Sequence, residues 1–199
     1  GRIRVRSKSG EISQSIAEDT GVALKETREG WTLETIRPKT RRSWKQRENR
    51  VDYELWVPTA LLLTIDTQHS NVLLESMTGA QSVKGQHGNL ELRSIGGRAD
   101  VRHEHGKVTL NAIGSAATVT KRHGDLSIRD IQGFLDLNQE HGAATVSQVL
   151  GEVTVVKRHG PLDLNQIRGS VALDQEHSTA DIQSVEGGLN SRRRHGSLK

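Results

Sequence analysis

The chain has 199 residues, of which 33% are apolar and only 3% are aromatic. A single large core usually needs an apolar share nearer ~45–50%, so this composition disfavours one compact globule and suits many small, repeated cores. Cys is absent, which excludes a disulfide framework, and no run of ~18 apolar residues occurs, so the sequence predicts no membrane-spanning segment.

The N-terminal region, residues 1–57, differs from the rest of the chain. It begins with Gly1 rather than Met, and no basic-then-apolar stretch of the kind found in signal peptides opens it. Alternating apolar residues predict short strands near residues 3–5, 22–24, 31–33 and 51–57. A stack of strands exposes a pairing edge unless its first strand is covered. We therefore expect residues 1–57 to form a capping β-region.

A basic loop, residues 37–50, is predicted inside this region. The formal net charge of the chain is +4, and residues 1–56 account for all of it, with 13 Lys and Arg against 9 Asp and Glu. Bases and one tryptophan crowd the loop: Arg37, Lys39, Arg41, Arg42, Trp44, Lys45 and Arg47. Such a cluster is either a polyanion patch or a solvated connection between strands. The solvated connection is favoured, and no specific nucleic-acid partner is expected, because no nucleic-acid-binding motif accompanies the loop.

Residues 58–199 carry an uninterrupted 18-residue repeat. Its most regular mark is a histidine at eight equally spaced positions: His69, His87, His105, His123, His141, His159, His177 and His195. The next residue is Gly in six units and Ser in two, and His103 alone falls outside the series. A fixed period of this kind is the signature of a repeat architecture.

Each unit places apolar residues three, five, eight, twelve and fourteen positions after its histidine. In one unit these residues are Leu90, Leu92, Ile95, Ala99 and Val101. Apolar residues two apart predict strands with one buried face, so each unit should hold two strands and five inward residues. A glycine ten positions on, such as Gly97, is expected to turn the chain because glycine accepts a positive φ.

One unit alone buries too little apolar surface to offset the entropy of ordering it, so the units are expected to stack. A meander would not place every histidine in the same environment. The predicted fold is therefore all-β: a single-stranded parallel β-helix, or β-solenoid, of about eight 18-residue repeats. The residue before each histidine alternates in sign from Glu104 to Arg194. An 18-residue coil stacks Glu on Arg, whereas a 36-residue coil would stack like charges, so the shorter coil with an ion-pair ladder is favoured.

Two segments resemble a known family. The unit KRHGPLDLNQIRG, from Lys157 to Gly169, and the run VDYELWVP, from Val51 to Pro58, are similar to a bacterial adhesin family of β-strand repeat proteins, a domain of unknown function. The resemblance covers nearly the whole chain. It implies a right-handed parallel β-helix in an exported or envelope-associated bacterial protein, without catalytic residues. Many members of that family carry Asn where this chain carries His.

The histidine ladder has three interpretations. The favoured one is structural, because His and Asn tolerate the left-handed region at a corner better than most residues. Neighbouring imidazoles could instead hold Zn²⁺ or Cu²⁺, but no carboxylate accompanies every histidine, so no metal site and no cofactor is predicted. The third is pH sensing: protonated neighbours would repel, and acidification should then destabilise the rod most steeply at about pH 6 or somewhat below.

Catalysis is not predicted, because a catalytic set needs different residues in one unique place, whereas here the same histidine recurs in every unit. The sequence favours a non-enzymatic structural or adhesin-like module of a bacterial cell envelope or exported protein, which binds a surface, a glycan or a protein. The alternative is a self-assembling, bactofilin-like filament in which open coil ends stack.

Overall fold

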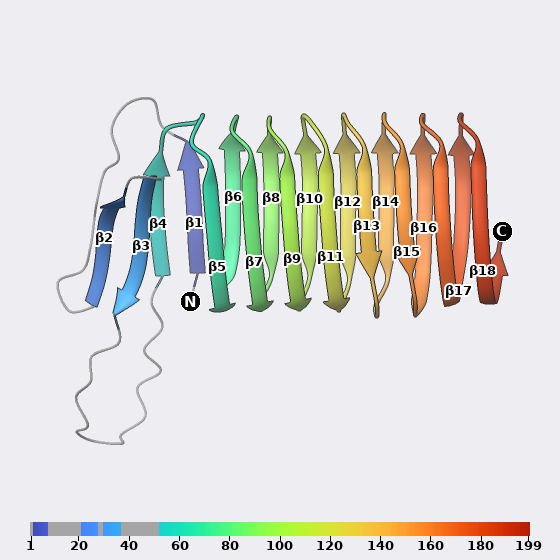
Figure 1. Ribbon diagram of the computed structural model, residues 1–199, viewed down its shortest axis with the longest axis horizontal. Coiled ribbons are helices and arrows are strands. Elements are labelled where there is room, and N and C mark those ends of the chain that lie inside the picture. Colours follow the sequence, from blue (N-terminus) through green and yellow to red (C-terminus); the bar gives the residue numbers. More distant parts are fainter. Residues whose placement is uncertain (1, 8–20, 28–29, 37–51) are drawn as a thin grey trace, which may run out of the picture.

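The computed structural model describes residues 2–7, 21–27, 30–36 and 52–199, and every regular element in these ranges is a β-strand. Figure 1 shows the strands packed side by side along a straight rod. One face contains β6 (Asn71–Met77), β8 (Leu90–Ile95), β10 (Val108–Ile113), β12 (Leu126–Ile131), β14 (Ala144–Val149) and β16 (Gly160–Ile167). The other contains β5 (Leu63–His69), β7 (Gln81–His87), β9 (Ala99–His105), β11 (Ala117–His123), β13 (Leu135–Gln139) and β15 (Val153–Lys157).

The last two strands run round the histidine corner and join the faces. β17 (Val171–Val185) pairs first with β15 and then with β16, and β18 (Leu189–Leu198) pairs with β17 along its length. Every pairing among strands β5 to β18 is parallel and joins residues 18 apart, as Val108 pairs with Leu126 and Ala117 with Leu135. The predicted β-solenoid with 18-residue coils is therefore confirmed. The handedness stays a prediction.

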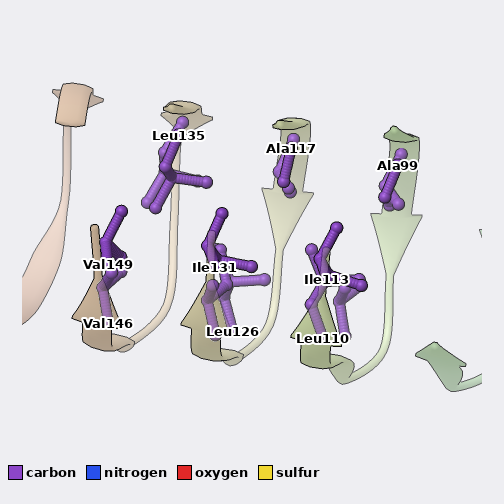
Figure 2. Close-up of a cluster of buried hydrophobic side chains, with 14 of the residues drawn as sticks. Ala99, Leu110, Ile113, Ala117, Leu126, Ile131, Leu135, Val146 and Val149 are labelled. Carbon is purple, nitrogen blue, oxygen red and sulfur yellow. The ribbon is translucent and has the colours of Figure 1, made fainter. Parts of the chain in front are cut away.

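The core lies between the two faces. The apolar positions named from the sequence point inward in successive coils, and Ile95, Ile113 and Ile131 are fully buried. Figure 2 shows side chains from both faces filling the space between them, including Leu110, Ile113, Leu126, Ile131, Val146 and Val149 on one face and Ala99, Ala117 and Leu135 on the other. Each coil thus contributes one thin layer of aliphatic side chains.

The expectation of five inward residues per coil is too low. The strand alternation continues past the apolar positions to a sixth inward position, two residues before each histidine. In six coils the residue there is both polar and buried: Thr67, His103, Lys121, Gln139, Lys157 and Gln175. Polar residue types are mostly exposed in proteins, so the sequence alone suggests that this position lies at a solvent-exposed end of the strand. The structure shows that it is buried.

The expected role of the glycines ten positions after each histidine is also wrong. Positive φ at this corner belongs to the residues seven positions on, which include Ser94 (φ 54°) and Asp130 (φ 59°), and not to glycines such as Gly151. A Cβ on Gly151 would instead lie 2.5 Å from the backbone carbon of Gly133 in the neighbouring coil. Glycine is needed there because the backbones of adjacent coils approach closely.

The N-terminal strands begin with β1 (Arg2–Ser7), which pairs in parallel with both β4 (Asp52–Val57) and β6. β2 (Gly21–Thr27) and β3 (Gly30–Ile36) form a separate antiparallel pair, drawn at the N-terminal end of the rod in Figure 1. The division between a cap at 1–57 and a solenoid at 58–199 stays a prediction. No helix in the described ranges is long and apolar enough to cross a membrane.

The C-terminal end of the rod is open. Nearly all of β18 is exposed, and Leu189, which occupies a core position of the repeat, is 47% exposed. Among the strands that the structure describes, β18 pairs only with β17. Its outer edge therefore presents free backbone donors and acceptors as well as apolar surface.

Candidate functional site

The eight repeated histidines form one column along an edge of the rod. Their rings stack face to face from His69 to His195, with centroid separations of 4.7 to 5.5 Å and interplanar angles of 4° to 19°. All are exposed except His123, which is partly buried. Each ring face is covered by its neighbour, so solvent meets a continuous row of ring edges. We call this column the histidine edge.

Local backbone geometry holds the histidine edge in line. The glycine after the histidine takes a positive φ in six coils, from 97° at Gly160 to 144° at Gly196. Where Ser178 replaces that glycine, His177 itself takes the left-handed conformation with a φ of 49°. Histidine tolerates this region better than β-branched or bulky residues do. The turn thus differs between coils, and the parallel register, which pairs His69 with His87 and His105 with His123, sets the rings above one another.

The charged residues before the histidines form an outer column beside the edge. Glu140 lies 3.7 Å from Arg122 and 4.0 Å from Arg158, so one carboxylate serves the arginines of both neighbouring coils. These side chains are between 36% and 60% exposed, so each pair adds little stability. The predicted ion-pair ladder is thus present over these three coils.

Behind the histidine edge, the buried polar side chains at the sixth inward position form an inner column. Nζ of Lys157 donates hydrogen bonds to the carbonyl oxygens of Gly142 (2.6 Å) and His159 (2.5 Å). Nζ of Lys121 likewise donates to the carbonyls of Gly106 and His123. The positive-φ corner turns these carbonyls away from the strand ladder, and the inner column supplies the missing donors.

Glutamine fills the same role in alternate coils without a charge. Nε2 of Gln139 donates to the carbonyl oxygens of Gly124 (2.9 Å) and His141 (3.3 Å). Its amide oxygen, like that of Gln175, is buried and has no hydrogen-bond partner within the described structure, which is a cost that lysine avoids. The alternation of Lys and Gln keeps buried cations two coils apart.

Burial changes the acid–base behaviour of the inner column. Burial, and then the charge of Lys121, lower the pKa of His103 from 6.5 to about 4. Burial also lowers the pKa values of Lys121 and Lys157 from 10.5 to about 8, although the charge of Asp125 opposes this shift. The ring of His103 lies 3.4 Å from Nζ of Lys121. It fits because the neighbouring coil has Gly85, where a Cβ would lie 2.7 Å from the ring.

Sequence reasoning missed the inner column. The signal that could have found it is the strand alternation itself, since Ala99, Val101 and His103 are two apart and must share a face. His103 breaks the histidine period, and it is the buried histidine. The hydrogen-bonding demand of the corner carbonyls could not be read from the sequence.

The stacked rings do not form a chelating pair. Parallel rings direct their in-plane nitrogen lone pairs in parallel directions, so two neighbours cannot converge on one ion unless a ring rotates. Across the described ranges, no group of three or more His, Cys, Asp and Glu side chains is arranged to hold a metal ion. The residues of the predicted polyanion patch, from Arg37 to Arg47, lie outside the described residues.

No family model, no curated protein and no solved structure matches this chain. The fold and the columns described above therefore carry the functional argument, and the adhesin family enters only as a proposal.

Proposed function

We propose that this chain is a non-enzymatic structural and binding module, an adhesin-like β-solenoid of a bacterial cell-envelope or exported protein that holds a surface, a glycan or a protein on its flat faces. The observation that carries this proposal is the unbroken register: strands 18 residues apart pair in parallel through the whole repeat region. No loop is inserted between residues 69 and 195, because every histidine interval is 18 residues.

The uniform coils support a binding role over a catalytic one. Outward side chains repeat in columns, such as Thr109, Ser127 and Thr145, which are adjacent in register on one face. Catalytic groups need one unique constellation, and loops are the usual means of building it on a repetitive scaffold. A face of repeated small polar groups fits many weak contacts with a repetitive partner, where avidity replaces a single deep pocket.

Retention on a coated surface tests this function. Beads that carry the full chain should be retained on polysaccharide-coated or protein-coated slides under flow at neutral pH, and the chain should release no reducing sugar from the polysaccharide. The variant Thr109→Lys, Ser127→Lys and Thr145→Lys changes one face, and the matched variant Thr118→Lys and Thr154→Lys changes the other. Loss of retention with one variant would identify the binding face. Retention unaffected by both, or release of sugar, would contradict the proposal.

The bacterial envelope location is proposed on the resemblance of residues 51–58 and 157–169 alone. Fractionation of cells that express the natural protein, followed by detection with an antibody against the repeat region, tests it directly. Recovery in the envelope or the medium would support the location, and recovery in the cytosol would contradict it.

Self-assembly is the second candidate, and the stacking of coil on near-identical coil in one parallel register is the observation that favours it. Free strand edges template pairing with another chain, and exposed Leu189 of β18 adds apolar surface. Light scattering should then show particle mass rising with protein concentration. Leu189→Lys should abolish the rise, whereas Leu150→Lys, at a residue that is 40% exposed on the side of the rod, should not. Persistent monomers would remove this candidate.

A further inference from the structure

The histidine edge combines a regular spacing with free access to solvent. It presents one imidazole per coil in a row whose neighbouring rings are 4.7 to 5.5 Å apart. Histidine is the side chain whose charge normally changes between about pH 5 and about pH 8. Protons added to such a row would form a linear array of cations.

The groups around the row do not neutralise those added charges. The cations on the flanking and inner columns are Lys84, Arg102, Lys107, Lys121, Arg122, Lys157, Arg158, Arg192, Arg193, Arg194 and Lys199. The carboxylates on the same columns are Asp66, Glu91, Glu104, Asp125, Glu140, Asp163, Asp174, Glu176 and Asp181. Buried His103 also faces the row from the inner column. These eleven cations and nine carboxylates leave a small positive balance, and each protonated histidine adds to it.

Protonation of neighbouring imidazoles is opposed by their mutual repulsion, which amounts to about 1 kcal/mol for unit charges at this distance in water. A bound polyanion removes much of that repulsion. Protonation and polyanion binding therefore promote each other, because each stabilises the state that the other favours. Salt bridges to Glu140 hold the outer column beside the row and do not cover it.

We propose that the histidine edge is a pH-gated binding site for a linear anionic polysaccharide, engaged on mild acidification and released in mildly alkaline solution. This inference rests on the proposed function of the chain as a binding module and names its ligand class. A straight row of cations suits an extended chain with regularly repeated acidic groups, which can follow the row over several coils.

Nucleic acid fits the edge less well. Proteins that bind single strands stack the bases on free aromatic faces, but here each imidazole face is covered by the next ring. The phosphates of a duplex wind around the helix axis, so only a few of them can meet a straight row. The uniform spacing of the edge thus favours a polysaccharide.

Heparin is a suitable probe for the full chain. Its affinity at constant ionic strength should rise by about tenfold or more between about pH 8 and about pH 5.5, because several imidazoles gain charge over this range. Calorimetry in buffers of different ionisation enthalpy should also show that binding takes up protons at the lower pH. Equal affinity at both pH values would overturn the proposal, and so would binding without proton uptake.

A set of variants locates the effect. His105→Asn, His123→Asn, His141→Asn and His159→Asn together should remove most of the rise in affinity. Arg93→Gln with Arg129→Gln, on a different column, should leave the rise intact. If the fourfold variant does not melt like the parent chain, His123→Asn with His141→Asn should still lower the proton uptake by about a quarter, because two of the eight imidazoles of the row are removed. A pH dependence that survives these changes would overturn the proposal.

Two more measurements distinguish the polysaccharide from nucleic acid and the histidine edge from the basic loop. Single-stranded poly(dT) that binds as tightly as heparin at the lower pH would replace the polysaccharide with nucleic acid. Arg41→Ala, Arg42→Ala and Lys45→Ala should not affect the rise in affinity, and loss of the rise in that variant would place the effect in the basic loop. If the pH-dependent binding fails in every measurement, the surface retention at neutral pH still stands, so this inference and the proposed function can fail separately.

Discussion

At the histidine corner of six coils the chain turns on a glycine with positive φ, whereas at the opposite corner it turns on Ser, Ala, Asp or Gln residues with positive φ. The first corner leaves carbonyls that need buried donors, and Lys121, Gln139 and Lys157 supply them. Among the described residues, the second has a buried polar side chain only at Gln81, whose Nε2 donates to the carbonyls of Leu61 and Gly79, and it requires glycine where the backbones of adjacent coils approach. The comparison shows that two tight turns can place opposite demands on the residues around them.

The largest expected effect comes from filling the space at the first corner. Gly124 has a φ of 99°, and a Cβ there would lie 2.5 Å from the carbonyl oxygen of Gly106. Because this oxygen belongs to the backbone and cannot rotate away as a side chain could, Gly124→Ala should lower the free energy of unfolding by about 3 kcal/mol or more. Urea denaturation measures the change. Gly188→Ala is the matched control, since a Cβ there meets nothing within 4 Å, and equal effects at the two sites would contradict the packing argument.

The buried histidine of the first corner gives the next effect. The pKa of His103 is lowered from 6.5 to about 4, so between these values the unfolded chain binds the proton and the folded chain does not. Stability from this residue is therefore complete above pH 6.5 and is lost as the pH falls toward 4, by about 2 to 3 kcal/mol in all.

Thermal melting of the parent and of His103→Gln over this pH range measures that loss. The variant should show a shallower fall in melting temperature, because Gln has no proton to gain and already serves at the equivalent position in Gln139. His141→Gln, at an exposed residue of the histidine edge, is the control and should leave most of the fall in place. Parallel curves for the parent and His103→Gln would contradict the assignment.

Comparison of the corners also explains what the sequence could reveal. The apolar positions, such as Leu92 and Ile95, were predictable because period-two hydrophobicity reports burial directly. The inner column was not, because Lys121 and Lys157 are polar and become buried only where corner carbonyls need donors. Gly97 and Gly106 look alike in the sequence, and both lie close to the backbone of the neighbouring coil, yet only Gly106 has a positive φ. At the site, the spacing of the histidines could be predicted from the sequence, whereas the stacking that covers the ring faces is visible only in the structure.

A smaller effect should distinguish donors from charge in the inner column. Lys157→Met leaves two buried carbonyls without donors, which costs about 1 to 3 kcal/mol each, but it also removes a buried charge whose pKa has fallen from 10.5 to about 8. The net loss should be about 1 to 2 kcal/mol. Lys157→Gln keeps the donors and should stay within about 1 kcal/mol of the parent. Urea denaturation measures the free energy of unfolding of both variants. Equal values for Lys157→Met and Lys157→Gln would show that the donors are not needed.

The smallest effect belongs to the outer column, where the pairs are exposed. Glu140→Gln removes the carboxylate that Arg122 and Arg158 share, and because these side chains are largely solvated the free energy of unfolding should fall by no more than about 0.5 to 1 kcal/mol. The loss should vanish in about 1 M salt, where charges are screened within about 3 Å. The control Asp136→Asn changes an exposed carboxylate on the same face outside this ladder. If the free energy of unfolding is still lower in Glu140→Gln at high salt, Glu140 acts through packing and not through charge. The alternating charges of the outer column would then not favour the 18-residue register.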